Sequence, residues 1–369
     1  MAGSSFGTLF RITTWGETHG KGVGVVVDGC PAGLSLSEED IQIYLDRRKP
    51  GQSKFTTKRQ ESDSVEILSG VFEGKTTGSP ISLVVYNQDQ RSKDYSNIMD
   101  KYRPGHADYT FDKKYGFRDY RGGGRSSGRE TIARVAAGAI ACKLLKEMGI
   151  TIFAYTKSIG EIVVKEENIR REERDNNALY MPDANAFEKA KEYVETLMSR
   201  LDSAGGVVEC VVDGLPAGLG EPVFDKLSSN LAKAICSIGA VKGFEIGDGF
   251  LATRACGSSN NDPFSIDQDG KVVKETNHAG GVLGGMSDGS ELIFRAGFKP
   301  TASIAREQHT VNQQGEEVDI VIKGRHDPLI VPRAVVVVET MAACTILDLL
   351  LCNMTARLDR IQDFYQRVR

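Results

Sequence analysis

The chain has 369 residues, of which 40% are hydrophobic and 26% are charged, with a formal net charge of −4 and a pI of about 5.9. This composition is ordinary for a soluble globular protein. The acidic balance argues against a general nucleic-acid-binding protein, which would more often be basic. The 40 glycines predict many tight turns and close backbone approaches.

The seven cysteines are scattered and odd in number, and they include no Cys-x-x-Cys pair. This usage predicts reduced thiols in a cytoplasmic protein. The N-terminus has no basic start followed by an apolar run, so no secretory signal is expected. The longest apolar stretch, 341–352, is shorter than the roughly 20 residues that cross a bilayer. We expect it to form a buried helix, and we expect no membrane partner.

No low-complexity linker divides the chain, which predicts a single domain over 1–369. One weak internal sequence similarity links Val25–Leu34 with Val211–Leu219. Each segment has a β-branched run, then Asp-Gly, then Pro-Ala-Gly, and each predicts a strand, a turn and the start of a helix. Two explanations remain open: two unrelated turns that share common residues, or a pseudo-duplicated β–α unit.

The segment Asp119–Glu130 sets three arginines around a glycine run and then starts a helix that is predicted over Ser127–Met148. Ser127 and Glu130 have the spacing of a capping box. Unpaired N–H groups and the positive end of the helix dipole lie at such a start. The segment therefore predicts a site for a phosphate or for a dense set of carboxylates.

The remaining segments carry simpler signals. The highly charged region 161–186 predicts a surface insertion, and Phe187–Leu201 predicts an amphipathic helix. The run Val335–Val338 resembles a buried strand, and the tail 357–369 predicts a solvated helix.

A second basic run, Arg47–Arg59, holds six cations and no acid. It fits a solvated face, a mobile loop that closes over an anionic ligand, or a nucleic-acid patch. The Pro50-Gly51 pair favours a loop, and the overall acidity disfavours nucleic acid.

Three of the five histidines lie in glycine-containing segments unlike core helix or strand: His19 in 16–20, His106 in 103–108 and His326 in 324–328. Histidine is well suited to proton transfer near neutral pH. Several such histidines, each near arginine or a carboxylate, favour a catalytic site. Their spacing does not match a metal site, and no metal is expected.

A third element combines the glycine pairs of Asn277–Gly289 with Phe298–Ile304. Glycine pairs let the backbone approach a flat ligand, although this stretch alone would also fit an elaborate turn. The chain has no Gly-x-x-x-x-Gly-Lys-[Ser/Thr], no Gly-x-Gly-x-x-Gly and no Gly-x-Ser-x-Gly. P-loop, Rossmann and α/β-hydrolase sites are therefore not supported.

Together these motifs resemble chorismate synthase, in that family's order and from about residue 7 to 345. The resemblance implies an α+β fold, a β-α-β-α sandwich with helices packed between two antiparallel sheets, and assembly as a homotetramer. The segments that carry it are 16–20, 103–108, 119–130, 280–285, 299–303 and 324–328.

The resemblance also implies a lyase reaction, the last step of the shikimate pathway in aromatic amino acid biosynthesis. The substrate, 5-enolpyruvylshikimate 3-phosphate, loses phosphate and a ring proton in an anti-1,4-elimination that gives chorismate. Reduced FMN is the cofactor, although the reaction has no net redox change. NADPH is expected only as a possible reductant. Since no extra reductase domain is visible, an external flavin reductase is the expected source of reduced flavin.

The family pattern implies roles for individual residues. The catalytic residues are His19, which would protonate the departing phosphate, His106, which would protonate or hold the reduced flavin, and Asp327, which would support proton removal near flavin N5. The substrate's phosphate and two carboxylates would meet the cations Arg48, Lys54, Arg103 and Arg129.

A larger set is expected at FMN: Arg125, Ser126, Ser127, Gly239, Ala240, Gly284, Lys299, Pro300, Thr301, Ala302, Ser303 and Arg325. The chain departs from the usual family pattern at Thr18 for Ser, Lys54 for Arg, Gly128 for Ala and Gly239 for Asn. The last change removes a side-chain donor and puts a flavin contact there in doubt.

Two other functions remain to be weighed. A conventional FMN-dependent oxidoreductase could use the same loops, and it would consume NAD(P)H in step with product. An RNA- or polyanion-binding protein could use 47–59 and 118–134, and it would bind with strong salt dependence. The acidic pI argues against the second.

Overall fold

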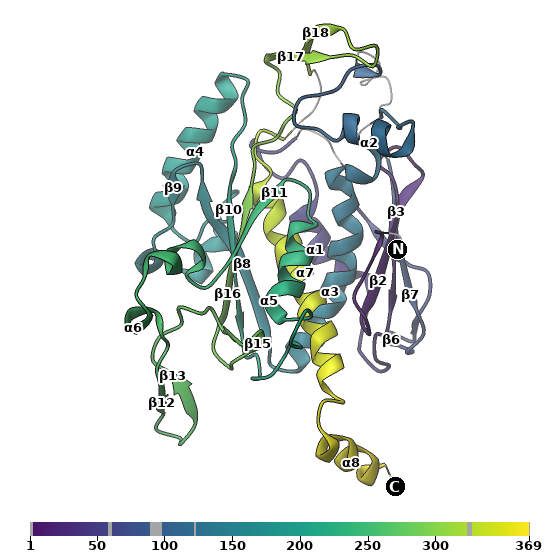
Figure 1. The fold of residues 1–369 in the computed structure, drawn as a ribbon. Coiled ribbons are helices and arrows are strands. Elements are labelled where there is room, and N and C mark those ends of the chain that lie inside the picture. The colour runs from purple at the N-terminus through teal and green to yellow at the C-terminus, as the bar shows by residue number, and fades with distance from the viewer. Residues whose placement is uncertain (1–2, 58–60, 89–97, 122, 323–326, 369) are drawn as a thin grey trace.

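The computed structural model describes residues 3–57, 61–88, 98–121, 123–322 and 327–368. Two five-stranded antiparallel sheets lie on either side of a layer of helices (Figure 1). The predicted α+β fold, with helices between two antiparallel sheets, is confirmed.

The first sheet contains, in spatial order, β1 (Ser5–Phe6), β2 (Arg11–Gly16), β3 (Gly22–Asp28), β7 (Ile81–Tyr86) and β4 (Val65–Ile67). The second contains β11 (Val241–Ile246), β16 (Leu292–Phe298), β10 (Gly206–Asp213), β8 (Thr151–Ile159) and β9 (Ile162–Val163). The layer between them contains α1 (Glu38–Arg48), α3 (Thr131–Glu147), α5 (Leu227–Cys236) and α7 (Val331–Asn353).

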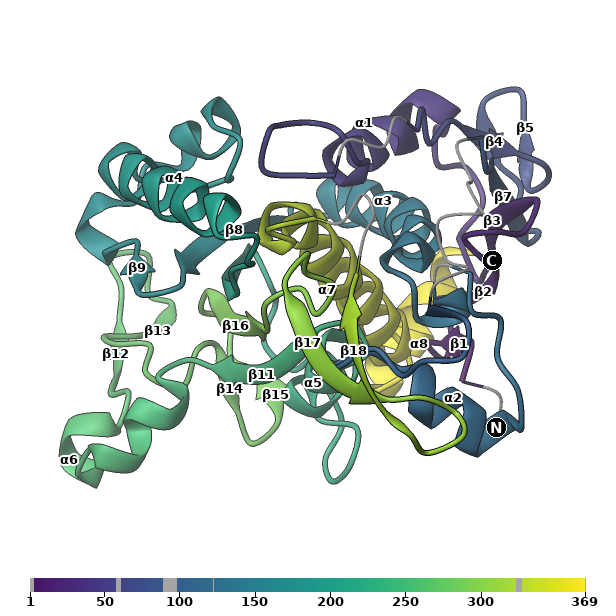
Figure 2. The same ribbon diagram turned by 90° about the horizontal axis from the view of Figure 1, so that it is seen from above.

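Smaller elements lie around this centre. The helices among them are α2 (Asp108–Tyr115), α4 (Ala184–Ser199), α6 (Gly257–Asn260) and α8 (Leu358–Arg367). The hairpins are β5 (Val71–Phe72) with β6 (Lys75–Thr76), β12 (Phe264–Ile266) with β13 (Val272–Lys274), β14 (Val282–Leu283) with β15 (Met286–Ser287), and β17 (Glu307–Val311) with β18 (Glu317–Val321). The last hairpin stands above one end of the helix layer (Figures 1 and 2).

Each sheet buries one face against the helices. Along β2 the buried residues alternate with exposed ones, and along β16 they alternate with half-buried ones. This is the period of two that a sheet with one covered face requires. The helices are apolar enough to fill the space between the sheets, so residues of both sheets and all four helices belong to one hydrophobic core.

The two sheets are built from the same series of elements. The first half runs β2, β3, α1, β4, β7, α3, and the second runs β8, β10, α5, β11, β16, α7. Corresponding strands hold corresponding places, since β3 lies between β2 and β7 just as β10 lies between β8 and β16.

The two turns that share this sequence pattern, in 25–34 and 211–219, also match in their hydrogen bonds. The Thr76 hydroxyl accepts from the Leu34 N–H at 3.0 Å and donates to the Pro31 carbonyl at 2.7 Å. In the second half, the Ser287 hydroxyl accepts from the Leu219 N–H at 2.9 Å and donates to the Pro216 carbonyl at 2.6 Å. These paired contacts favour a pseudo-duplicated unit over two unrelated turns.

The core helix α7 corrects one sequence prediction. Val335–Val338, which resembles a buried strand, lies inside this 23-residue helix. The helix is buried on nearly all sides, so its sequence has no polar face, and periodicity cannot separate such a helix from a buried strand. By length and composition α7 could cross a membrane, but 83% of its most apolar stretch is buried inside the protein.

The crossing of α3 and α7 is close because α3 has a small-residue side. Gly138 of α3 lies against Thr340 of α7, and a Cβ added to this glycine would come within 2.3 Å of the Thr340 Cβ. Only glycine fits there without movement of the helices.

The N-terminal capping expected from the sequence is present at α1 and only partly present at α3. At α1, the Asp40 carboxylate accepts from the Ser37 N–H at 2.9 Å, as in a capping box. At α3, the Ser127 hydroxyl accepts from the Arg129 N–H, but Glu130 bonds to other groups and a 3₁₀ turn (η3, Gly128–Glu130) precedes the α-helix. The regular helix thus begins at Thr131, later than predicted.

The charged region 161–186 contains β9 and two 3₁₀ turns. Many of its charged side chains are exposed, while Val164, Leu179 and Met181 are fully buried in the core. Arg174 donates to Glu339 of α7 at 3.3 Å, so the segment is also tied to the central helix.

Candidate active site

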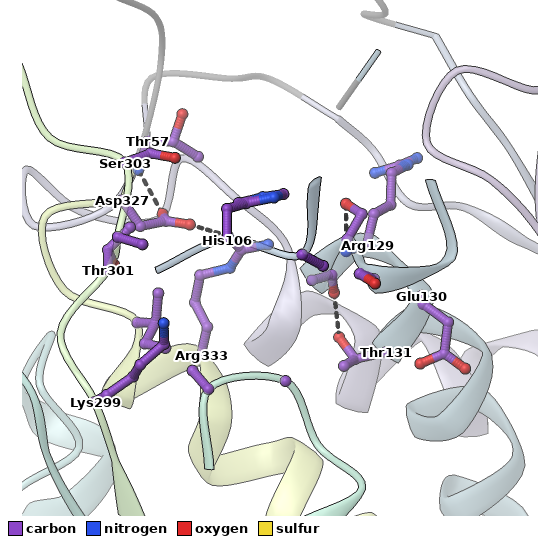
Figure 3. A pocket seen from close by; sticks show the side chains of 18 of the residues that line it. Thr57, His106, Arg129, Glu130, Thr131, Lys299, Thr301, Ser303, Asp327 and Arg333 are labelled. Carbon is purple, nitrogen blue, oxygen red and sulfur yellow. Dashed lines mark hydrogen bonds and ion pairs between the residues drawn. The ribbon is translucent and has the colours of Figure 1, made fainter. Parts of the chain in front are cut away.

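A cavity of about 600 Å³ lies at the end of the helix layer (Figure 3). Its walls include the C-terminal ends of α1 and α5 and the N-terminal ends of α3 and α7, together with the segments 103–107 and 299–303. The lining residues are Arg48, Pro50, Thr57, Glu61, Arg103, Gly105, His106, Ala107, Arg125–Thr131, Arg134, Ser237, Gly239, Ala240, Lys299–Ser303, Asp327, Ile330 and Arg333.

Two predicted substrate cations meet on one wall. Arg48 ends α1 and Arg129 lies in η3, and both are buried. The Asp63 carboxylate joins them, with Oδ2 3.1 Å from Arg48 Nη1 and Oδ1 2.8 Å from Arg129 Nη1. Burial, together with nearby Arg333, lowers the pKa of Arg48 from its ordinary value. The charged form of Arg48 is therefore costly to keep without an anion beside it.

His106 and Arg103 share the buried carboxylate of Asp108. Arg103 donates to it through Nε and Nη2, each at 2.7 Å, and His106 Nδ1 lies 3.2 Å from Asp108 Oδ1. Hydrogen bonds from Arg103 and His106 outweigh burial and hold the pKa of Asp108 well below its usual range. A Cβ added to Gly123 would lie 3.0 Å from the His106 ring, so the glycine run packs against this histidine.

Asp327 is held from both sides. It accepts from the Thr57 N–H at 2.8 Å and from Arg333 Nη1 at 2.6 Å (Figure 3). Arg333 also donates to the Arg48 carbonyl at 3.0 Å. Arg333 therefore links the start of α7 to the end of α1 across the cavity.

The opposite wall is formed by Lys299–Ser303 with Gly239 and Ala240. Lys299 Nζ donates to the Gly105 carbonyl at 2.6 Å, which joins this wall to the His106 segment. The Thr301 Oγ1 is buried and has no hydrogen-bond partner within the described residues. Its hydroxyl is available to a ligand.

The arginines of the 119–130 segment have separate partners. Arg121 pairs with Asp119 at 2.7 Å and is half exposed. Arg125 lines the cavity and donates to the Gly16 carbonyl at 3.0 Å and the Thr14 hydroxyl at 2.6 Å. Arg129 faces the cavity, and its Nη2 lies 3.5 Å from Glu61. The segment as a whole is therefore not one anion loop. Ser126 and Ser127 line the cavity beside it.

His19 lies on the turn between β2 and β3 and is not among the described lining residues. The turn is tied to the site by Asn87, whose side-chain nitrogen donates to the Glu17 and Gly20 carbonyls at 2.9 and 2.8 Å. The Asn87 oxygen accepts from Arg129 Nε at 2.5 Å. One amide thus connects the His19 turn with a cavity arginine.

Other predicted residues lie apart from the cavity. Lys54 pairs with Glu195 and lines a neighbouring hollow, which shares Thr57, Ser303 and Asp327 with the cavity. Gly284 lies in the β14–β15 turn beside Gly285, whose carbonyl accepts from Leu227 N–H at the start of α5. The cavity is at the other end of this helix, roughly 15 Å away at 1.5 Å per residue. Arg325 and His326 lie outside the described residues.

Sequence reasoning missed Asp63, Glu61 and Arg333. Arg333 follows Val331-Pro332, and proline at a first helical turn is a start signal. Reading 335–338 as a strand concealed that signal. Asp63 and Glu61 follow the basic run and become significant only when the fold brings α1 and α3 together.

The cavity suits a flat, anionic cofactor such as FMN on one side. The buried Thr301 hydroxyl lacks a partner, Lys299 supplies a cation, and Gly239 and Ala240 leave room for a ring system. These observations fit the flavin that the resemblance implies.

Comparisons with known proteins agree on one family. The sequence model of the family described as chorismate synthase matches residues 10–351. The chorismate synthases of Agathobacter rectalis and Lachnospira eligens are 68% and 66% identical to the chain, each over 100% of both proteins. A crystal structure of chorismate synthase superposes with a TM-score of 0.77 at 31% identity, covering 98% of each chain.

Proposed function

The chain belongs to the chorismate synthase family, and from that premise we propose that its cavity converts 5-enolpyruvylshikimate 3-phosphate to chorismate. Membership makes the protein a carbon–oxygen lyase at the last step of the shikimate pathway. The family in general depends on reduced flavin, and FMN is the flavin that we propose for this chain.

The charge of the cavity carries this proposal. Among the residues that the structure describes, seven cationic side chains and three carboxylates line it. A substrate with one phosphate and two carboxylates matches that excess, because guanidinium groups bind both kinds of anion with paired hydrogen bonds. We assign substrate binding to Arg48, Arg103 and Arg129. We assign Lys54 a place at the edge, where it would have to leave Glu195.

FMN is assigned to the second wall. Lys299–Ser303, Gly239 and Ala240 would hold it, with Arg125, Ser126 and Ser127 approaching from the start of α3. When bound, reduced FMN would supply an electron for the elimination and recover it at the end.

Three side chains are assigned to proton handling. His106 would hold or protonate the reduced flavin from the segment that Lys299 joins to the second wall. Asp327, fixed by Thr57 and Arg333, would assist removal of the ring proton. His19 would protonate the departing phosphate from the turn that Asn87 ties to Arg129.

The test is an anaerobic assay with dithionite-reduced FMN and the substrate. Phosphate and chorismate should appear in equal amounts with no net oxidation of flavin. His106→Ala should lower turnover by at least about 10-fold, as expected for a proton-transfer group. His309→Ala is the matched control, because His309 is exposed on β17 and paired with Asp319. Absence of phosphate release would contradict the proposal. In a parallel assay with NAD(P)H as the reductant, NAD(P)H oxidation matched to product would support a conventional oxidoreductase.

We also propose that the protein is a cytoplasmic homotetramer that receives reduced flavin from outside, with NADPH acting only as a reductant. The seven free cysteines support a reducing setting. The exposed apolar side chains of hairpin β12–β13, including Phe264, Ile266 and Val272, support contact with another subunit.

A further inference from the structure

A single buried carboxylate lies behind two of the cavity's arginines. The Asp63 side chain is 0% exposed, and Asp63 is not among the described residues that line the cavity. Its two oxygens contact different guanidiniums, Arg48 from α1 and Arg129 from η3. A ligand in the cavity would touch the arginines and not the carboxylate.

The other partners of these arginines hold them only in part. Arg48 donates to the Thr131 hydroxyl at 3.1 Å and the Gly128 carbonyl at 2.6 Å. Arg129 donates to Asn87, and its buried Nη2 makes no hydrogen bond within the described residues but lies 3.5 Å from Glu61 Oε2. Asp63 contacts both guanidiniums, and among the described residues it thereby fixes the position of one relative to the other.

The surrounding charges make this contact necessary. Arg48 lies near Arg333 as well as Arg129, so three cations repel one another in a buried site. Asp63 is held in a left-handed backbone conformation with φ of 46°, which is uncommon for a residue other than glycine. The fold keeps that strained position and places the carboxylate between the two arginines.

We propose that Asp63 is a positioning residue that sets the spacing and orientation of Arg48 and Arg129 for one anionic group of the substrate. The inference rests on the proposed function for the identity of that substrate. It adds a residue that acts on substrate binding through two others.

Two physical effects of removing the Asp63 charge have opposite signs. If the carboxylate acted only as a nearby negative charge, its loss would raise the positive potential of the cavity and tighten anion binding. If it positions the guanidiniums, its loss would let them move apart and weaken binding. The direction of the change in KM therefore decides between the two.

The experiment compares Asp63→Asn and Asp63→Glu with the wild-type enzyme. Asparagine keeps the shape and removes the charge, while glutamate keeps the charge and changes the reach. Asp46→Asn is the matched control, because Asp46 is half exposed on α1, away from the cavity, and pairs with Lys49. Substrate KM, kcat, the Kd for FMN without substrate, and thermal unfolding are measured for each protein.

We expect Asp63→Asn to raise KM at least about 10-fold, as for a lost charge-assisted contact, with kcat and the Kd for FMN nearly unchanged. Asp63→Glu should raise KM less, and Asp46→Asn should leave it unchanged. The double variant Asp63→Asn with Arg129→Lys should raise KM by less than the product of the two separate fold-changes. An unchanged or lower KM in Asp63→Asn overturns the proposal.

The outcome stays informative if a variant or the assigned reaction fails. Where Asp63→Asn does not fold, Asp63→Glu replaces it, and an unchanged KM in a folded Asp63→Glu protein overturns the proposal. If the wild-type protein forms no chorismate, the proposed function is wrong, but the proposal for Asp63 can still be tested. Inorganic phosphate is then the probe: weaker phosphate binding by Asp63→Asn supports positioning, and equal or tighter binding overturns it.

Discussion

The two halves of the molecule differ at the point where a helix passes into the edge strand of its sheet. In the first half, α1 and β4 are separated by residues 49–64, which include Thr57, Glu61 and Asp63. In the second half, α5 and β11 are separated only by 237–240, with the small residues Ser237, Gly239 and Ala240. Both connections reach the same cavity from equivalent places in a repeated fold.

This difference gives the two walls of the cavity different chemical groups. The long connection brings carboxylates that hold Arg48 and Arg129, so its wall can carry closely spaced cations for a polyanion. The short connection leaves space, and Thr301 and Lys299 add donors beside it. On the proposed assignment of substrate and FMN, the two connections help to give a repeated scaffold a different wall for each ligand.

The largest expected effect comes from Arg129→Ala. Loss of a buried guanidinium should raise the substrate KM by about 100-fold, since contacts between charged groups are worth about 1.5–3 kcal/mol. The Kd for FMN, measured by fluorescence titration, should change less than about 3-fold, because flavin is assigned mainly to the other wall.

Arg129→Lys is the companion variant, and its KM should lie between those of Arg129→Ala and the wild type. Equal losses of substrate and flavin affinity in Arg129→Ala would contradict the division between the walls.

A second prediction tests the repeat itself. Thr76→Val and Ser287→Ala each remove a buried hydroxyl that bridges a leucine N–H and a proline carbonyl. Each should lower the free energy of unfolding by about 2 kcal/mol, since buried backbone groups lose their partners. Urea denaturation measures both.

Thr77→Val is the control for the turn, because Thr77 is exposed and its hydroxyl lies 3.3 Å from the Gly70 carbonyl. It should have little effect on stability. A large cost at one of the two buried hydroxyls and none at the other would show that the matched turns are not energetically equivalent.

The smallest expected effect comes from Thr301→Val. Removing the unpartnered hydroxyl should raise the Kd for FMN by about 5- to 10-fold, corresponding to about 1 kcal/mol for one hydrogen bond. Substrate KM at saturating FMN should stay within about 2-fold. Thr110→Val serves as a control, because Thr110 is exposed on α2. A change confined to substrate KM would contradict the assignment of Thr301 to the flavin wall.

Sequence predicted the parts of the site that have local signatures. Glycine turns and a helix start marked the segment around Arg129, and the His106 segment was marked by its glycine and arginine. Both prove to line one cavity. The α+β layers followed from a family resemblance and not from periodicity.

Other parts depended on tertiary placement. Asp63 contacts arginines 15 and 66 residues away in the chain, and no local pattern reports such a contact. Val335–Val338 was assigned to a strand because a helix buried on all sides lacks the polar face that would identify it. Gly284, which the family pattern places at the flavin, lies at the far end of α5 from the cavity, and its contact with FMN stays a prediction.

The crossing at Gly138 and Thr340 has a consequence for how this protein can diverge. The separation of α3 and α7 at this crossing depends on residue 138 having no side chain, because an added Cβ would come within 2.3 Å of the Thr340 Cβ and 2.6 Å of its carbonyl oxygen. Homologues that keep glycine at this position can change the cavity by exchanging the side chains of its walls, while the spacing of the two helices stays the same. Sequence divergence in such homologues should then change which ligands the cavity selects, while the distance between α3 and α7 is kept.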